Sequence, residues 1–137
     1  MTEPIFLTFE DVIEIHRDQL TRYGGAPGIR DVGLLQSAVL MPLAQFDGNF
    51  LHKDLFEMAA AYLFHLSKNH PFIDGNKRVG TVAALLFLML NGYEVIVVGT
   101  LLEKLVLEIV EGKKTKEQAG RFLHRHSQKI EPTKDNS

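Results

Sequence analysis

The segment from Val82 to Leu90 contains apolar residues only, and this run limits the folds open to the chain more than any other feature. A helix on a protein surface repeats its apolar residues every three or four positions, whereas a helix that is apolar on every side is normally buried. The run is about half as long as a membrane span requires. It therefore predicts the buried centre of a helical bundle.

Composition narrows the class of protein. The chain has 137 residues, 45% of them hydrophobic, which suits one globular domain with its own core. Its net charge of −2 and isoelectric point near 6.3 predict neither nucleic-acid binding nor attraction to a membrane, and they argue against a DNA-binding regulator. There are no cysteines, so thiolate metal sites and disulfides are excluded. The acidic start, Met1 to Pro4, does not resemble a signal peptide, and we expect a cytoplasmic protein.

Periodicity and capping signals predict an all-α bundle of about six helices, with at most a short extended segment near residues 93–98. Thr8 and Asp31 are expected to cap the first two helices, and the segment 45–50 is expected to be a loop. We expect a single domain over residues 1–126. The polar segment 127–137 is expected to be a disordered tail.

The stretch from His70 to Gly80 carries the densest polar chemistry of the chain, directly before the apolar run. Pro71 disfavours helical conformation at His70, so the stretch reads as a loop followed by a helix N-terminus. Such a terminus has free backbone N–H groups and suits an anion. Lys77 and Arg78 in its first turn oppose the helix dipole, which a need for positive charge explains better than two solvated surface cations do.

Two residues of this stretch each have two readings. Asp74 is either an N-cap or a ligand for a divalent cation beside phosphates, and its cationic neighbours favour the metal without excluding the cap. His70 is a candidate general base because its ordinary pKa lies near neutrality, although a lone histidine is more often structural. The other histidines show no metal-ligand spacing, so a zinc enzyme is not expected.

This stretch resembles the signature of the Fic/Doc family, His-x-Phe-x-Asp/Glu-Gly-Asn-Gly/Lys-Arg. Every fixed position is matched, by His70, Phe72, Asp74, Gly75, Asn76, Lys77 and Arg78. The segment from Arg22 to Gly28 and the short length also look like the death-on-curing (Doc) branch. In the Fic branch, which transfers AMP, a glycine follows the asparagine and a second arginine lies three residues after the first. Here Lys77 and Thr81 stand at those two positions, as in the Doc branch.

The resemblance implies an ATP-dependent protein-modifying transferase, a serine/threonine kinase acting on a threonine of elongation factor Tu and thereby inhibiting translation. By position, His70 takes the proton from the target hydroxyl and Asp74 binds Mg²⁺. Asn76 and the backbone near Gly75 cradle phosphate of ATP, while Lys77 and Arg78 bind phosphate and neutralise developing charge. Phe72 is expected to anchor the loop.

The family sometimes carries an inhibitory motif, Ser/Thr-x-x-x-Glu-Gly/Asn, in the same chain. The nearest candidate, Glu111-Gly112, has Leu107 where the hydroxyl residue belongs. The resemblance therefore implies a toxin held in trans by an antitoxin whose disordered C-terminal segment folds onto it. Two alternatives stay open: a Fic-type AMP transferase acting on a protein hydroxyl, and a catalytically silent module that binds a phosphate-bearing ligand or the antitoxin.

Overall fold

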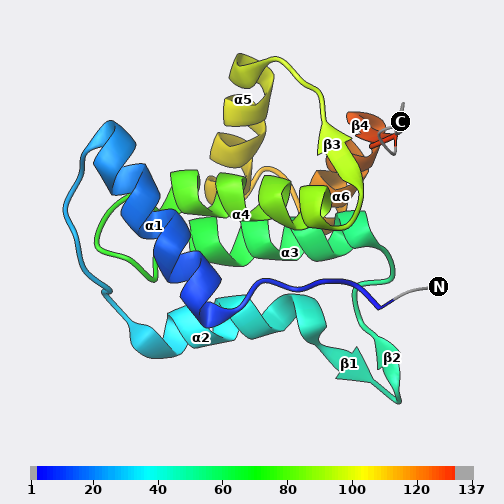
Figure 1. Ribbon diagram of the computed structural model, residues 1–137, viewed down its shortest axis with the longest axis horizontal. Coiled ribbons are helices and arrows are strands. Elements are labelled where there is room, and N and C mark those ends of the chain that lie inside the picture. Colours follow the sequence, from blue (N-terminus) through cyan, green and yellow to red (C-terminus); the bar gives the residue numbers. More distant parts are fainter. Residues whose placement is uncertain (1–2, 132–137) are drawn as a thin grey trace, which may run out of the picture.

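The computed structural model describes residues 3–131, and within that range it confirms the predicted all-α bundle with six α-helices (Figure 1). The elements in chain order are α1 (Phe9–Tyr23), α2 (Val32–Leu40), the 3-10 turn η1 (Met41–Leu43), β1 (Gln45–Phe46), β2 (Asn49–Phe50), α3 (Leu55–Lys68), α4 (Asn76–Leu90), β3 (Tyr93–Val95), α5 (Gly99–Val110), α6 (Lys116–Arg125) and β4 (Ser127–Lys129).

Helices α3 and α4 form the centre of the bundle and run side by side in opposite directions (Figure 1). Their close approach depends on Gly80 of α4. A Cβ atom there would lie 2.5 Å from the Ser67 hydroxyl oxygen and 3.1 Å from the Leu63 carbonyl oxygen of α3. Small buried side chains continue the seam, among them Ala83 and Ala84. The α3–α4 pair is the frame on which the connecting loop, residues 69–75, is held.

The helix ends follow the local sequence. Thr8 forms a capping box with Asp11, and Asp31 accepts a hydrogen bond from the Leu34 N–H, which confirms both predicted caps. Thr115 likewise forms a capping box at the start of α6. Caps of this kind stabilise a helix by about 1 kcal/mol each. The boundaries of the helices are therefore largely local properties of the chain.

Two short antiparallel strand pairs correct the sequence-based picture. The segment expected to be a loop at 45–50 forms the β1–β2 hairpin, and β3 pairs with β4. Since β4 is Ser127–Lys129, regular structure continues past residue 126, into the segment expected to be a disordered tail. The prediction was wrong there because the polar strand gains its order from pairing with Tyr93–Val95. Residues 132–137 of that segment lie outside the described residues.

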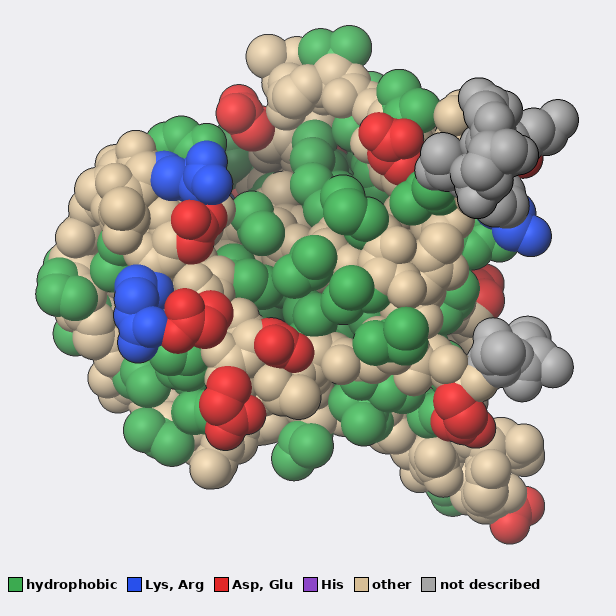
Figure 2. Space-filling view, viewed as in Figure 1, with side chains coloured by type: hydrophobic (Ala, Val, Ile, Leu, Met, Phe, Trp, Pro, Cys, Tyr) green, Lys and Arg blue, Asp and Glu red, His purple; other side chains and the backbone are tan. Residues whose placement is uncertain are grey.

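Helix α4, which the sequence predicted to be buried on every side, is partly exposed. Hydrophobic side chains gather over the middle of the face shown in Figure 2, where α4 lies between α1 and α5. Met89 and Leu90 are exposed on α4, and Val82, Leu85 and Leu86 are partly exposed. Among residues 3–131 no helix has the length and hydrophobicity needed to cross a membrane.

Candidate active site

The loop between α3 and α4 carries His70 in an unusual backbone conformation. Its φ of 49° lies in the left-handed region, which among the described non-glycine residues only Asp47 shares. Such a conformation costs on the order of 1 kcal/mol or more and persists only where the surroundings hold it. The imidazole is exposed and lines a cavity together with Asp74 and Lys77. Restraints on this loop come from the segment before α2, from α1 and from the first residue of α4.

Backbone hydrogen bonds join residues 28–31 to this loop. The N–H groups of Arg30 and Asp31 both donate to the Pro71 carbonyl, at 2.8 and 3.0 Å, and the Ile73 N–H donates to the Gly28 carbonyl at 3.1 Å. A bridge between Ile29 and Phe72 lies between them. Two segments distant in sequence thus fix the path of the loop on both sides of Phe72.

The Arg30 side chain adds a second restraint directly at His70. Its Nε donates to the His70 carbonyl at 2.6 Å, and its Nη2 donates to the Asn69 carbonyl at 2.9 Å. A planar guanidinium can satisfy two carbonyls at once in this way. Sequence reasoning missed Arg30, and no local signal marks it, because its partners lie 39 and 40 residues further along the chain.

Two buried side chains hold the loop from beneath. Phe72 is 1% exposed and stacks on the His16 ring of α1, with centroids 3.9 Å apart. The His16 Nε2 lies 3.0 Å from the Asp74 carbonyl oxygen, which only accepts, so Nε2 carries the proton. Phe72 is therefore the anchor that the sequence predicted. His16 was missed, although a polar pair, His16 and Gln19, on the buried face of α1 was a visible signal.

Asn76 closes the loop rather than pointing outward. Its Oδ1 accepts from the Phe72 N–H at 2.9 Å and its Nδ2 donates to the Phe72 carbonyl at 3.0 Å. The residue is buried. The side chain that the sequence assigned to phosphate is thus committed to the loop backbone, and what Asn76 offers a ligand is the N–H group of its own first-turn position.

Asp74 lines the cavity and is exposed. Its Oδ2 accepts from the Ala26 N–H at 3.1 Å and its Oδ1 from the Gly75 N–H at 2.8 Å. These hydrogen bonds, that from Ala26 first, lower the pKa of Asp74, with smaller contributions from Arg78 and His16. Asp74 is not the N-cap of α4. Gly75 takes that position with a φ of 81° and no side-chain cap.

The two cations after Asn76 lie in the first turn of α4 but differ in how they are held. The Lys77 side chain is exposed, whereas Arg78 is half-buried. The Arg78 Nη2 donates to the Gly24 carbonyl at 3.1 Å, and its guanidinium lies 5.7 Å from the centre of the Tyr23 ring. Gly25 leaves room for this arrangement, since a Cβ there would lie 2.9 Å from Asp74 Oδ2 and 3.3 Å from Arg78 Nη2.

The loop and the first turn of α4 line one cavity of about 280 Å³, and every polar residue that the sequence proposed for the site is part of its lining. Its lining residues are His70, Ile73, Asp74, Gly75, Asn76, Lys77 and Arg78. The cavity offers an imidazole, an ionised carboxylate, two cations and the free N–H groups of a helix N-terminus, which together suit a phosphate chain.

A divalent cation fits the same site if nucleotide phosphates supply part of its ligands. Among residues 3–131, no group of three or more His, Asp or Glu side chains gathers as a metal cage. Asp74 is a single exposed carboxylate that lines the cavity together with Lys77 and Arg78. Mg²⁺ is commonly held by one or two carboxylates together with substrate phosphates and water. The donor set therefore suits Mg²⁺ that arrives with a nucleotide.

Comparison with known proteins agrees with this geometry. The profile of the Fic/DOC family matches residues 6–88. The chain is 38% identical over 86 residues to "Protein kinase doc" of Escherichia phage P1, covering 63% of this chain and 68% of that protein. It is 40% identical over 94 residues to "Toxin Doc" of Mycolicibacterium smegmatis, covering 69% of this chain and 68% of that protein. With its helical fold, its loop geometry and these matches, the chain belongs to the Fic/Doc family.

Proposed function

We propose that this protein transfers the γ-phosphoryl group of ATP to a hydroxyl of another protein. The observation that carries the proposal is the single cavity in which His70, Asp74, Lys77 and Arg78 meet at the N-terminus of α4. The match to a protein named a kinase supports the same reaction class. The substrate that the resemblance suggests is a threonine of a translation factor, elongation factor Tu.

In the proposed reaction, His70 accepts the proton of the target hydroxyl as its oxygen bonds to the γ-phosphorus. The bond from that phosphorus to the β–γ bridging oxygen breaks, and ADP leaves. The Asp74 carboxylate, whose pKa the Ala26 and Gly75 N–H groups lower further, would hold Mg²⁺, which would supply charge neutralisation to the phosphate oxygens. Lys77 and Arg78 stabilise the charge that develops during transfer.

Lys77 and Thr81 favour phosphate transfer over AMP transfer. Lys77 puts an ammonium group where the AMP-transferring branch has glycine, and Thr81 places no cation where that branch has arginine. The Thr81 hydroxyl instead donates to the Lys77 carbonyl, at 2.8 Å, within its own helix. Incubation of a cell lysate with this protein and either γ- or α-labelled ATP separates the two reactions. Label from the γ position supports the kinase, and label retained from the α position refutes it.

We further propose that the protein is the toxin of a toxin–antitoxin module and acts in the cytoplasm. The relative named a toxin supports this. A groove of about 600 Å³ between α1, α4 and α5 shares Lys77 and Arg78 with the cavity, and Val82, Leu102 and Val106 give it an apolar wall. An amphipathic helix from the C-terminal segment of an antitoxin would fit such a groove and cover the cavity.

Expression of the protein alone tests its activity in a cell. We expect growth arrest with the native chain and normal growth with His70→Ala. Since His70 is exposed, its truncation should leave the fold unchanged, and circular dichroism of the purified variant checks this. A folded His70→Ala protein that remains equally toxic would contradict the catalytic role and favour a silent binding module.

A further inference from the structure

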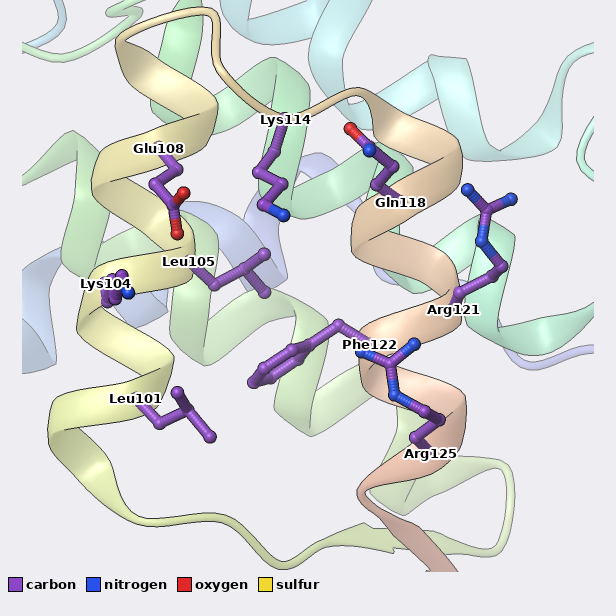
Figure 3. A pocket seen from close by; sticks show the side chains of 9 residues that line it. All are labelled: Leu101, Lys104, Leu105, Glu108, Lys114, Gln118, Arg121, Phe122 and Arg125. Carbon is purple, nitrogen blue, oxygen red and sulfur yellow. The ribbon is translucent and has the colours of Figure 1, made fainter.

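A second cleft lies between α5 and α6 (Figure 3). Its α5 residues differ from those that line the groove beside the loop, so it lies on another side of α5. Its volume is about 430 Å³, and it shares no lining residue with that groove. Leu101 and Leu105 of α5 and Phe122 of α6 give it an apolar floor. Lys104, Lys114, Arg121 and Arg125 line it as well, together with Glu108 and Gln118.

The cations come from three different segments, and Figure 3 shows Lys114 and Arg125 reaching toward the cleft, whereas Arg121 points to the outer side of α6. Lys114 belongs to the turn between the helices and extends into the cleft between Glu108 and Gln118 (Figure 3). That turn is held because the N–H groups of Lys113 and Lys114 donate to the Glu108 carbonyl, at 2.7 and 3.2 Å. Arg125 reaches toward Phe122 from the end of α6 (Figure 3). The backbone hydrogen bonds of this turn thus fix the position from which Lys114 extends over the floor.

This charge is not balanced locally. Four cationic residues and one carboxylate, Glu108, line the cleft. Salt bridges within residues 3–131 involve other groups and none of these four cations. The chain as a whole carries −2, so the cleft is a local departure from its acidic balance. Cations that surround a hollow apolar surface attract an anionic group and can place an apolar side chain beneath it.

We propose that the α5–α6 cleft docks an acidic segment of the protein that this chain modifies, with one large apolar side chain of that segment on the Leu101–Leu105–Phe122 floor. The floor favours a peptide over a nucleic acid. Phe122 is only 8% exposed and cannot offer a free face for base stacking. Leu105 is 4% exposed, so the accessible part of the floor is Leu101, at 42%, an aliphatic edge that suits a Leu or Phe side chain. A segment bound in this cleft leaves the His70 cavity open. A substrate needs that cavity open so that its hydroxyl can reach His70, whereas an inhibitor can cover it. This inference rests on the proposed function.

A binding measurement tests the cleft without any chemistry. The probe is a fluorescein-labelled eight-residue peptide of Asp and Glu with a central Leu-Phe pair, followed by fluorescence anisotropy. Lys114→Glu should weaken binding by about tenfold, and Leu101→Ser, which trims the exposed edge of the floor, by about threefold. Lys113→Glu is the matched control. It makes the same charge change one residue away, on a lysine that pairs with Glu111 at 3.3 Å and does not line the cleft, so binding should stay within about twofold.

Two outcomes of this measurement would overturn the cleft as a peptide site. An equal loss with Lys113→Glu and Lys114→Glu would mean diffuse charge attraction. Tighter binding of a single-stranded RNA octamer than of the peptide would mean a nucleic-acid surface. Circular dichroism of each variant confirms that it is folded.

The labelled-ATP reaction then tests whether the partner is the substrate. With Lys114→Glu, half-maximal labelling of the target should need about tenfold more lysate protein, while labelling at saturation is unchanged. His70→Ala should abolish labelling yet bind the peptide as tightly as the native chain, which separates failure of the catalytic proposal from failure of the cleft. Loss of peptide binding with unchanged labelling would overturn the assignment to the substrate.

Discussion

Asn76 satisfies both backbone polar groups of Phe72, accepting from its N–H at 2.9 Å and donating to its carbonyl at 3.0 Å. The first residue of α4 therefore holds the loop that carries His70. A side chain assigned to ligand binding from its motif position acts here on the backbone that presents the other site residues. The distinction can be measured, because a loop restraint affects stability and a direct ligand contact affects binding alone.

Asn76→Ala should lower the free energy of unfolding by about 2–4 kcal/mol, because it leaves the buried N–H and carbonyl of Phe72 without partners. Urea denaturation followed by circular dichroism measures the change. Asn69→Ala is the matched control, since the Asn69 side chain forms no hydrogen bond within residues 3–131 and only its carbonyl binds Arg30. Equal stability of Asn76→Ala and the native chain would contradict the role assigned to this amide.

Arg30→Ala should lower kcat by about tenfold or more with a smaller change in KM, because the loop at His70 loses two restraints while the residues proposed to bind phosphate keep theirs. Steady-state phosphorylation of the target at varied ATP measures both constants. Arg30→Lys should recover little, since an ammonium cannot bind two carbonyls in the geometry of the guanidinium. Full activity in the lysine variant would show that charge alone is needed at this position.

Gly80→Ala should destabilise the α3–α4 seam by about 1–2 kcal/mol, the steric cost exceeding the gain in helix propensity. The added Cβ would lie 2.5 Å from the Ser67 hydroxyl oxygen, a buried group without a hydrogen-bond partner among the described residues. Ser67→Ala removes that oxygen, so the double variant should be more stable than the sum of the single changes predicts. Additive thermal-denaturation results would mean that contact with the Leu63 carbonyl and the Ser67 backbone N–H dominates instead.

Acid should weaken the packing of α6 on α3 through His65. Burial first, and then the nearby Lys116 ammonium, lowers the pKa of His65 from 6.5 to about 4, and Lys116 Nζ lies 3.2 Å from its Nε2. Because the unfolded chain binds this proton more readily, the stabilisation is complete above pH 6.5 and is lost as the pH falls toward 4.

After allowance for solvent screening, this loss should amount to about 1–2 kcal/mol. Urea unfolding at pH 7, about 5.5 and about 4.5 measures it. His65→Leu should flatten the dependence while His52, whose pKa burial also lowers, continues to titrate. The same pH dependence in His65→Leu as in the native chain would assign the effect to other groups.

Lys77→Gly should weaken phosphoryl transfer while leaving the loop in place, since the Lys77 side chain is exposed and lines the cavity. Transfer of γ-label to the target, compared with His70→Ala, measures the loss. The variant also restores the glycine of the AMP-transferring branch, so the α-label experiment shows whether it gains that reaction. Full γ-transfer in Lys77→Gly would contradict the role assigned to the lysine.

Local chemistry made much of the fold predictable. The helices follow apolar periodicity, and their ends follow caps such as Thr8 and Asp31, whose hydrogen bonds reach only three residues along the chain. The strands were harder. Ser127–Lys129 is polar and short, and only its pairing with β3 makes it regular. The same limit hid Arg30, whose partners in the loop are distant in sequence, and it hid the partner of His16, although the place of His16 on the buried face of α1 was visible.

The sequence by itself determined the all-α class, the position of the loop before the apolar helix, and the set of side chains that could bind phosphate. These depend on residue type and spacing within a few turns of helix. Only the tertiary structure decided what each one does. It turned Asn76 inward, lowered the pKa of Asp74 through the Ala26 N–H, and held His70 at positive φ through Arg30. Such roles depend on contacts between segments that meet only when the chain has folded, and no local pattern specifies them.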